Sequence, residues 1–277
     1  LHILTQLIIT DVSACIYIVR HREDDSIVGG IDIDIKEAPH QISLKLHGSH
    51  ACGGSILDND IIITAAHCLL LSNNTEDYTI RAGSSSHDEG GEVRAVSKFI
   101  THPGFTNRYL DNDVGVLRLA EPLTYSDVVK PIDMANAGEE IPDEEECSVT
   151  GWGLLKQGGV CIPKHLQGVV ILKVNDNKCY EAYKKLNTVT ERMVCAGVPQ
   201  GGKSACNGDS GGPLVYNNKL HGIVSWGYGC AKPGYPTVFS KVSALRNWID
   251  ENIAKLKTED MKDDLNDGNN ELITMCD

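Results

Sequence analysis

The chain alternates between short apolar runs and polar or glycine-rich turns along most of its length. Over residues 41–46 every second side chain is apolar, which is the period of a β-strand with one buried face. Glycine or proline separates most of the later runs, and helical periodicity is absent between residues 41 and 241. We therefore predict an all-β fold, an antiparallel barrel or sandwich. The later runs are Ile61 to Ile63, Val114 to Leu119, Val169 to Leu172, Leu214 to Tyr216 and Ile223 to Trp226.

One helical pattern stands near the end of the chain. Apolar residues follow one another there at steps of three and four, which places them on one face of an α-helix. They are Val242, Leu245, Ile249, Ile253 and Leu256, with Trp248 beside them. We expect this segment to be the single long helix. From 257 to 277 the chain is acidic and poor in large apolar groups, so we predict a flexible, solvated tail.

The residues ahead of Ile27 divide into two parts. Residues 1–19 are strongly apolar with Asp11 as their single charge, and a polar, charged stretch follows. We predict that residues 1–14 are the remnant of a signal peptide and that residues 15–26 are a short propeptide. An ordinary strand or core segment is the alternative for the apolar part. Its length and its aspartate make it a weak candidate for a transmembrane span.

Composition narrows the class of protein further. The chain has 277 residues and is 41% hydrophobic, which is enough for a sizeable core in one large all-β domain or two small ones. Its ten cysteines indicate a disulfide-bonded protein of an oxidising compartment, and we predict that it is secreted. The formal net charge of −13 argues against nucleic acid or an anionic membrane as a partner, because both require a basic face.

A glycine-rich stretch around Ser210 carries the candidate chemistry. Ser210 lies between Asp209 and Gly211 in G-D-S-G-G-P, where glycines can direct successive backbone N–H groups at a developing oxyanion. A serine hydroxyl needs a base to take its proton, and His67 in T-A-A-H-C is the candidate. Asp113, at the start of an apolar run, is a candidate for holding the imidazole in the required tautomer. Taken alone, G-D-S-G-G is also a plausible surface turn.

Seven short motifs follow one another in the chain: I-V-G-G at 27 to 30, C-G-G-S at 52 to 55, T-A-A-H-C at 64 to 68, D-V-G-V-L at 113 to 117, G-W-G at 151 to 153, G-D-S-G-G-P at 208 to 213 and S-W-G at 225 to 227. In this order they resemble those of the trypsin/chymotrypsin-type serine endopeptidases. The resemblance implies a protease domain over residues 27–256. Its expected fold is two packed six-stranded antiparallel barrels with a C-terminal α-helix, and its expected active site lies between the barrels.

The resemblance assigns a role to each candidate residue. Ser210 would be the nucleophile, His67 the general base and then acid, and Asp113 the orienting carboxylate. The N–H groups of Gly208 and Ser210 would form the oxyanion hole, and Ser225 would hydrogen-bond near Asp113. Such a site hydrolyses peptide bonds through an acyl-enzyme and needs no cofactor or metal ion.

Activation is expected to follow the family's route with one departure. In this family, cleavage before the isoleucine of I-V-G-G frees an ammonium group that pairs with the aspartate preceding the serine. The corresponding pair here is Ile27 and Asp209. The residue before that isoleucine is usually Arg or Lys, whereas this chain has Ser26 after two aspartates. We therefore expect a zymogen that is opened by a protease of another specificity than trypsin's.

The primary specificity pocket is predicted to be neutral. By resemblance Ser204 forms its base and Gly227 and Gly234 its walls, with Ser225 and Trp226 beside them. A trypsin would carry Asp at the base, so Ser204 predicts chymotrypsin-like cleavage after Tyr, Phe, Leu or Trp. Trypsin-like specificity is the alternative.

The resemblance also pairs six of the cysteines: Cys52 with Cys68, Cys179 with Cys195, and Cys206 with Cys230. Tyr216 stands where the usual partner of Cys147 would be. The four cysteines that remain are Cys15, Cys147, Cys161 and Cys276. Pairing Cys147 with Cys161 and Cys15 with Cys276 fits their number, and free thiols are the alternative.

Other expectations concern ligands and partners. The calcium loop of trypsins has glutamates at its ends, but residues 83–92 begin with three serines after the glycine, so we predict no metal. Asn73-Asn74-Thr75 fits the N-glycosylation pattern. We expect a monomer whose partners are protein or peptide substrates and macromolecular protease inhibitors. The motifs are shared by digestive, venom and immune proteases. The alternative from another class is a non-cleaving homologue that acts as a binding module on the same fold.

Overall fold

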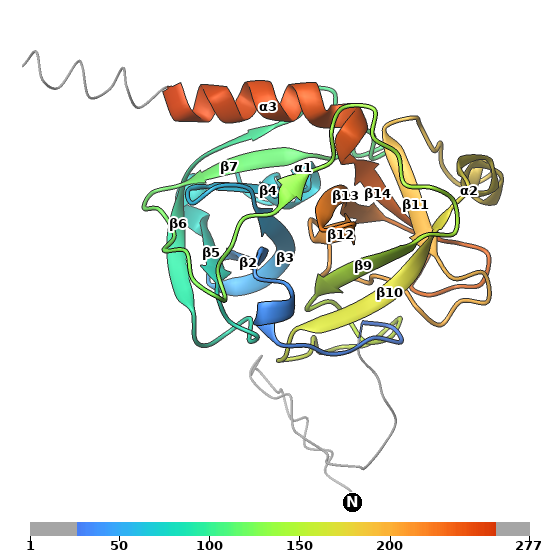
Figure 1. The fold of residues 1–277 in the computed structure, drawn as a ribbon, viewed down its shortest axis with the longest axis horizontal. Coiled ribbons are helices and arrows are strands. Elements are labelled where there is room, and N and C mark those ends of the chain that lie inside the picture. Colours follow the sequence, from blue (N-terminus) through green and yellow to red (C-terminus); the bar gives the residue numbers. More distant parts are fainter. Residues whose placement is uncertain (1–26, 259–277) are drawn as a thin grey trace, which may run out of the picture.

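A computed structural model describes residues 27–258, and Figure 1 shows two β-barrels side by side with a long helix across one end. The first barrel is closed by six antiparallel strands in the spatial order β2-β3-β4-β7-β6-β5. Its strands are β2 (Gln41–Leu46), β3 (Ser49–Ile56), β4 (Ile61–Thr64), β5 (Tyr78–Ala82), β6 (Glu92–Thr101) and β7 (Gly115–Leu119). The apolar side chains of these strands fill its interior, and Ile42, Ile62 and Leu117 are fully buried there.

The second barrel is also closed by six antiparallel strands, because β9 pairs with both β10 and β12. Its strands are β9 (Glu146–Gly151), β10 (Gln167–Val174), β11 (Met193–Gly197), β12 (Pro213–Tyr216), β13 (Lys219–Trp226) and β14 (Thr237–Lys241). Two short strands extend this sheet. β1 (Ile31–Asp32) pairs antiparallel with β10, and β8 (Asp133–Met134) pairs parallel with β13. The prediction of two six-stranded barrels is thus confirmed.

The helices are few, as the sequence predicts. They are α1 (Ala66–Leu69), α2 (Asp176–Tyr183), α3 (Val242–Thr258) and the 3-10 turns η1 (Ile35–Glu37) and η2 (Thr75–Asp77). The predicted C-terminal helix is α3, which follows β14 of the second barrel but packs its apolar face on the core of the first. The helix α3 therefore connects the two barrels through its packing. In the described part of the chain, no helix is long and apolar enough to span a membrane.

The strand predicted over residues 41–46 matches β2, but it was expected to bury one face and in fact buries both. Gln41 and Ser43 are fully buried and Lys45 is 7% exposed. The reason is that β2 lies at the seam between the barrels and contacts β9. The Thr150 hydroxyl donates to the Gln41 side-chain oxygen across the seam at 2.6 Å.

The predicted chain ends lie largely outside the described residues. Three predicted segments lie outside the described residues: the signal-peptide remnant (1–14), the propeptide (15–26) and the part of the tail from 259 to 277. Residues 257 and 258 are the last two of α3, so the helix runs beyond the predicted boundary at 256.

The three disulfides that the resemblance implied are present: Cys52–Cys68, Cys179–Cys195 and Cys206–Cys230. The pairing of Cys147 with Cys161 is wrong, because Cys147 is a free thiol and Cys161 is disulfide-bonded. Cys147 is buried among apolar side chains inside the second barrel, whereas Cys161 lies exposed on the loop after β9. Burial raises the pKa of the Cys147 thiol to about 11, which keeps it protonated and unreactive at neutral pH.

Candidate active site

His67 and Asp113 come together at the seam, on the side of the first barrel. His67 lies in the single turn α1, which begins two residues after the end of β4, and Asp113 stands two residues before β7, which pairs with β4. The Asp113 carboxylate accepts the His67 backbone N–H at 3.0 Å and lies 2.7 Å from the imidazole Nδ1. Two contacts to one carboxylate fix both the backbone and the ring of the histidine.

The environment of Asp113 decides which imidazole nitrogen carries the hydrogen. Asp113 is fully buried, and Ser225 from β13 donates a third hydrogen bond to its Oδ2 at 2.5 Å. A carboxylate with three donors is an acceptor, so we place the hydrogen of the neutral His67 ring on Nδ1. Nε2 is then left as an acceptor, which a general base requires. The Ser240 hydroxyl also donates to the Asp113 main-chain oxygen at 2.7 Å.

Ser210 reaches the same seam from the second barrel. Its main-chain oxygen accepts the N–H of Gly53 on β3 at 2.7 Å. Gly211 follows with φ +79, and a Cβ there would lie 2.1 Å from the Thr64 hydroxyl. Only glycine therefore allows the serine turn to approach Thr64, the residue that ends β4 just ahead of α1 and His67.

Two backbone N–H groups in the turn 208–210 have no hydrogen-bond acceptor among the described residues. Asp209, Gly211 and Gly212 each donate a backbone hydrogen bond. Between residues 27 and 258 no acceptor is found for the N–H groups of Gly208 and Ser210, and Gly208 has φ +99. These are the two groups that the resemblance assigns to the oxyanion hole, and both remain free to receive a substrate oxygen.

A half-buried histidine contacts the main-chain oxygen of Gly208. His50 Nε2 lies 2.9 Å from the Gly208 oxygen, and its Nδ1 lies 2.8 Å from the Ser43 hydroxyl. Burial lowers the pKa of His50 to about 4, so the ring is neutral at pH 7. Because a carbonyl only accepts, Nε2 donates to Gly208 and Nδ1 accepts from Ser43.

Asp209 is a buried carboxylate on the other side of the turn. It accepts the N–H of Gly153 at 2.7 Å and of Cys206 at 2.9 Å, and it is fully buried. Burial raises its pKa to about 7, although the two N–H groups act in the opposite direction. Ile27 is also fully buried, in the core of the second barrel, and Ser204 donates its N–H to the Val28 oxygen at 3.2 Å.

A pocket of about 180 Å³ opens beside Ser210. Ser225, Trp226 and Gly227 line it, as the resemblance implied, whereas Ser204 and Gly234 are not among its lining residues. Ser204 is buried next to the lining residue Ala205, donating to the Ala205 oxygen at 2.6 Å and accepting the Ala231 N–H at 2.7 Å. The other lining residues are Gln157, Ala205, Cys206, Asn207, Val224, Gly229, Cys230 and Thr237. None of them is charged.

With the geometry in place, the comparison with known proteins decides the family. The family model described as Trypsin matches residues 27–249. The chain belongs to the trypsin family of serine endopeptidases. A vitellin-degrading protease of Bombyx mori is 50% identical over 234 residues, which are 84% of this chain and 88% of the relative. A trypsin of Phaedon cochleariae is 43% identical over 227 residues, 81% and 87% of the two chains, and trypsin delta of Drosophila melanogaster is 42% identical over 230 residues, 83% and 89%.

The loop that corresponds to the calcium loop of trypsins holds a cationic side chain. The Arg81 guanidinium points into the loop and donates to the main-chain oxygens of Gly90 and, at 3.0 Å, of Asp88. A fixed positive charge on the loop carbonyls opposes Ca²⁺, which takes such oxygens as ligands. Within residues 27–258, one other group has metal-ligand spacing, His67 with Cys52 and Cys68, and the disulfide between these cysteines removes their thiolates.

Three residues at or near the site were missed by reasoning from the sequence: His50, Gln157 and Arg192. None of them belongs to the seven motifs, although His50 stands only two positions before C-G-G-S. The Gln157 side-chain oxygen accepts the Cys230 N–H at 3.4 Å at the pocket wall. Arg192 contacts Asp111, two residues before Asp113.

Proposed function

We propose that this trypsin-family protein is a secreted endopeptidase that cleaves peptide bonds with a triad of Ser210, His67 and Asp113. The observation that carries the proposal is the fully buried Asp113, whose Oδ2 lies 2.7 Å from His67 Nδ1. This bond leaves Nε2 as the base for a serine held at the same seam. The disulfides described above favour an oxidising, extracellular compartment.

The proposed reaction uses each of these groups in turn. Ser210 Oγ attacks the scissile carbonyl carbon while His67 Nε2 accepts its proton, and the oxygen of the tetrahedral intermediate receives the N–H groups of Gly208 and Ser210. Collapse breaks the peptide C–N bond, and His67 returns the proton to the leaving amine. Water then repeats both steps to hydrolyse the acyl-enzyme. Asp113 stays ionised throughout and stabilises the imidazolium.

Covalent labelling separates this proposal from a non-cleaving homologue. Protein processed to begin at Ile27 is treated with a fluorophosphonate, digested and mapped by mass spectrometry. We expect stoichiometric modification of the peptide that contains Ser210, because only an activated serine reacts rapidly with this reagent. A folded, processed protein that stays unlabelled would show that it is a binding module.

Processing before Ile27 is proposed to complete the site. The new ammonium group would pair with Asp209, whose buried carboxylate has two N–H donors among residues 27–258. A buried carboxylate without a countercharge is unfavourable, so the pair can act as a switch between inactive and active states. Ser26 before the cleavage site implies an activating protease that does not require Arg or Lys there.

The raised pKa of Asp209 predicts how the precursor responds to pH. Its folded-state pKa of about 7 lies above the ordinary 3.8, so the native precursor holds a proton that the unfolded chain releases. The free energy of unfolding should therefore fall as pH rises from about 4 to about 7, by about 4 kcal/mol. Denaturant unfolding of the precursor at several pH values measures this decline. Asp209→Asn should remove it, and equal slopes for both proteins would contradict the prediction.

Cleavage after large apolar or aromatic residues is proposed on the chemistry of the pocket. The Ser204 hydroxyl is engaged with Ala205 and Ala231, and the lining carries no charge, so an arginine side chain would be buried without a counterion. On matched peptides we expect kcat/KM after Phe to exceed that after Arg by roughly 10²-fold. Ser204→Asp should shift the preference toward Arg. A wild-type enzyme that prefers Arg would refute the assignment and favour trypsin-like specificity.

Substrates and partners follow from this chemistry. We propose protein substrates, and vitellin is a reasonable first one to test because the Bombyx mori relative is named for degrading it. We propose that the enzyme is a monomer and that macromolecular protease inhibitors can occupy its cleft.

A further inference from the structure

We propose that Arg192 is a positioning residue for the triad, because it holds the strained segment that carries Asp113 through an ion pair with Asp111. The inference rests on the proposed function of the triad and adds a residue to it. Arg192 belongs to the second barrel, one residue before β11, while Asp111 and Asp113 belong to the first. The contact therefore crosses the seam within two residues of the orienting carboxylate.

The segment ahead of Asp113 has an unfavourable backbone. Leu110 has φ +55 and Asn112 has φ +56, so the two neighbours of Asp111 are both left-handed without being glycine. Asparagine tolerates this conformation fairly well, but leucine rarely adopts it, and such a residue costs about 1 to 3 kcal/mol. A segment of this kind keeps its shape only when surrounding contacts impose it.

Asp111 receives those contacts from the second barrel. The Arg192 guanidinium forms a bidentate ion pair with the Asp111 carboxylate, in which Nη2 donates to Oδ2 at 2.5 Å and Nε donates to Oδ1 at 3.1 Å. The Thr190 hydroxyl adds a third hydrogen bond at 2.8 Å, and the Asn187 side-chain amide donates to the Tyr109 oxygen at 3.2 Å. Although burial opposes the charged form, the hydrogen bonds from Arg192 and Thr190 and the charge of Arg192 hold the pKa of Asp111 below its usual value.

Arg192 is itself fixed to the frame of the second barrel. Its main-chain oxygen accepts the N–H of Lys241, the last residue of β14, at 2.8 Å. The main chain that carries the guanidinium is thus hydrogen-bonded to the end of β14, next to the point where β11 and β14 begin to pair. A planar guanidinium with a fixed main chain binds a carboxylate in a bidentate way and so specifies its position. A single flexible ammonium group, as in lysine, cannot do this.

The consequence for chemistry lies in the alignment of Asp113 with His67. If the grip on Asp111 is lost, the left-handed residues can relax and displace the backbone of Asp113. Small displacements of a catalytic group lower the rate steeply, by as much as about 10²-fold for 1 Å. His67 and Ser225 still hold the carboxylate, so the loss should be partial.

The test measures kcat and KM per active site for Arg192→Ala, Arg192→Lys and Asp111→Asn, with active-site titration to count functional enzyme. We expect Arg192→Ala and Asp111→Asn to lower kcat by roughly 10-fold to 10²-fold with KM changed less than about threefold. The kcat of Arg192→Lys should lie between the kcat of these variants and that of wild type, because lysine keeps the positive charge but cannot form the bidentate contact. The variant with both Arg192→Ala and Asp111→Asn should be no worse than either single change.

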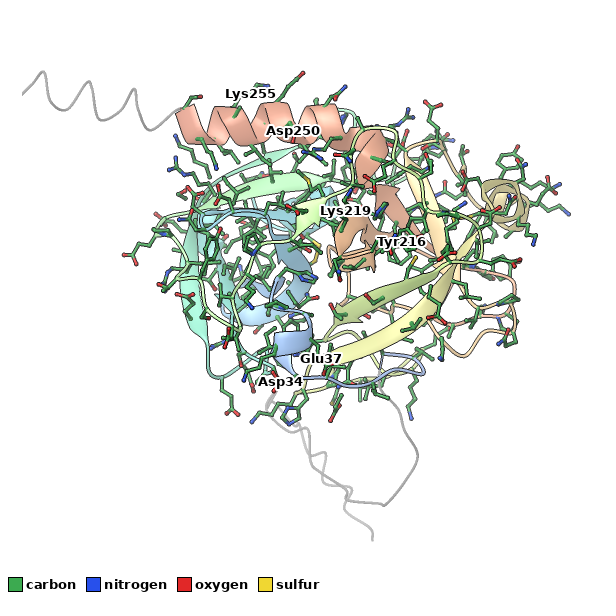
Figure 2. All side chains as sticks on the ribbon, viewed as in Figure 1. Asp34, Glu37, Tyr216, Lys219, Asp250 and Lys255 are labelled. Carbon is green, nitrogen blue, oxygen red and sulfur yellow. A yellow bond between two sulfur atoms is a disulfide. The ribbon has the colours of Figure 1, made fainter. Side chains whose placement is uncertain are left out.

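Arg246→Ala is the matched control. Arg246 also forms an ion pair with an aspartate, because its Nε lies 2.9 Å from both carboxylate oxygens of Asp250 on α3, and its Nη1 donates to the main-chain oxygen of Ala135 at 2.9 Å. Figure 2 labels Asp250 on the helix, on the outer side of the molecule. This variant should keep the wild-type kcat per active site.

The outcomes separate the two proposals. If the Ser210 of wild type is labelled and Arg192→Ala keeps the wild-type kcat per titrated site, Arg192 has only a structural role and this inference is overturned alone. Absence of labelling in wild type overturns the triad and this inference with it. Should Arg192→Ala fail to fold, the isosteric Asp111→Asn decides by the same measurement.

Discussion

Replacing Ser210 by alanine is expected to lower kcat by on the order of 10⁶, with little change in KM. The substitution removes the atom that attacks the carbonyl but keeps the backbone N–H of residue 210 and that of Gly208, which have no internal acceptor among the described residues. Substrate can therefore still bind, and a small residual rate above the uncatalysed reaction should persist. The measurement is steady-state hydrolysis of a peptide anilide by protein processed to Ile27.

Fluorophosphonate labelling provides the control for this variant. Ser210→Ala should lose the modification completely while its thermal unfolding stays close to that of wild type, because Ser210 is only partly buried and its main-chain bond to Gly53 remains. A variant that retains activity within about 10²-fold would show that the nucleophile lies elsewhere.

Replacing Asp113 by asparagine is expected to lower kcat by about 10⁴, a figure established for the same change in this family. An asparagine nitrogen facing His67 Nδ1 would donate a hydrogen, so the ring would carry its own hydrogen on Nε2 and could no longer accept the serine proton. The buried site of Asp113 holds the amide in the same place, since Ser225 and the His67 N–H remain as neighbours. Activity per titrated site on the same anilide checks the prediction.

The neighbouring aspartate supplies the matched control for Asp113→Asn. The same change at Asp111 removes a negative charge two residues earlier, yet it should reduce kcat by no more than roughly 10²-fold. Combining Ser210→Ala with Asp113→Asn should be no worse than Ser210→Ala alone, because the triad acts as a unit. Equal losses at Asp111 and Asp113 would mean that Asp113 acts only through its charge and does not set the tautomer.

The strands with a clear apolar pattern were predictable, and the others were not. The runs at 61–63 and 169–172 lie within β4 and β10, and the C-terminal pattern is α3. The strands β3 and β6 were not predicted from the sequence, because β3 contains two glycines and nearly all side chains of β6 are exposed or half-buried. Sheets accept such segments when neighbouring strands supply the hydrogen bonds, and this contribution is not written in the segment itself.

The residues of the candidate site were likewise predictable only in part. Motifs pointed to His67, Asp113 and Ser210, and the structure places all three residues at the seam, where their catalytic roles stay a prediction. Ser204 is buried and is not among the residues that line the pocket. The contact of Arg192 with Asp111 joins residues that are 81 positions apart, and nothing in either local sequence marks it.

By itself, the sequence determined the strand-rich class, the C-terminal helix and the residue types of the candidate triad, because hydrophobic period and short motifs report local conformation and local chemistry. The tertiary structure alone decided that Gln41 and Ser43 are buried, that Cys147 stays unpaired and that Asp111 is gripped by Arg192. These features arise where two closed barrels meet. Burial, cysteine pairing and backbone strain at that seam depend on which side chains from distant parts of the sequence meet there. The pattern of neighbouring residues along the chain does not indicate these long-range contacts.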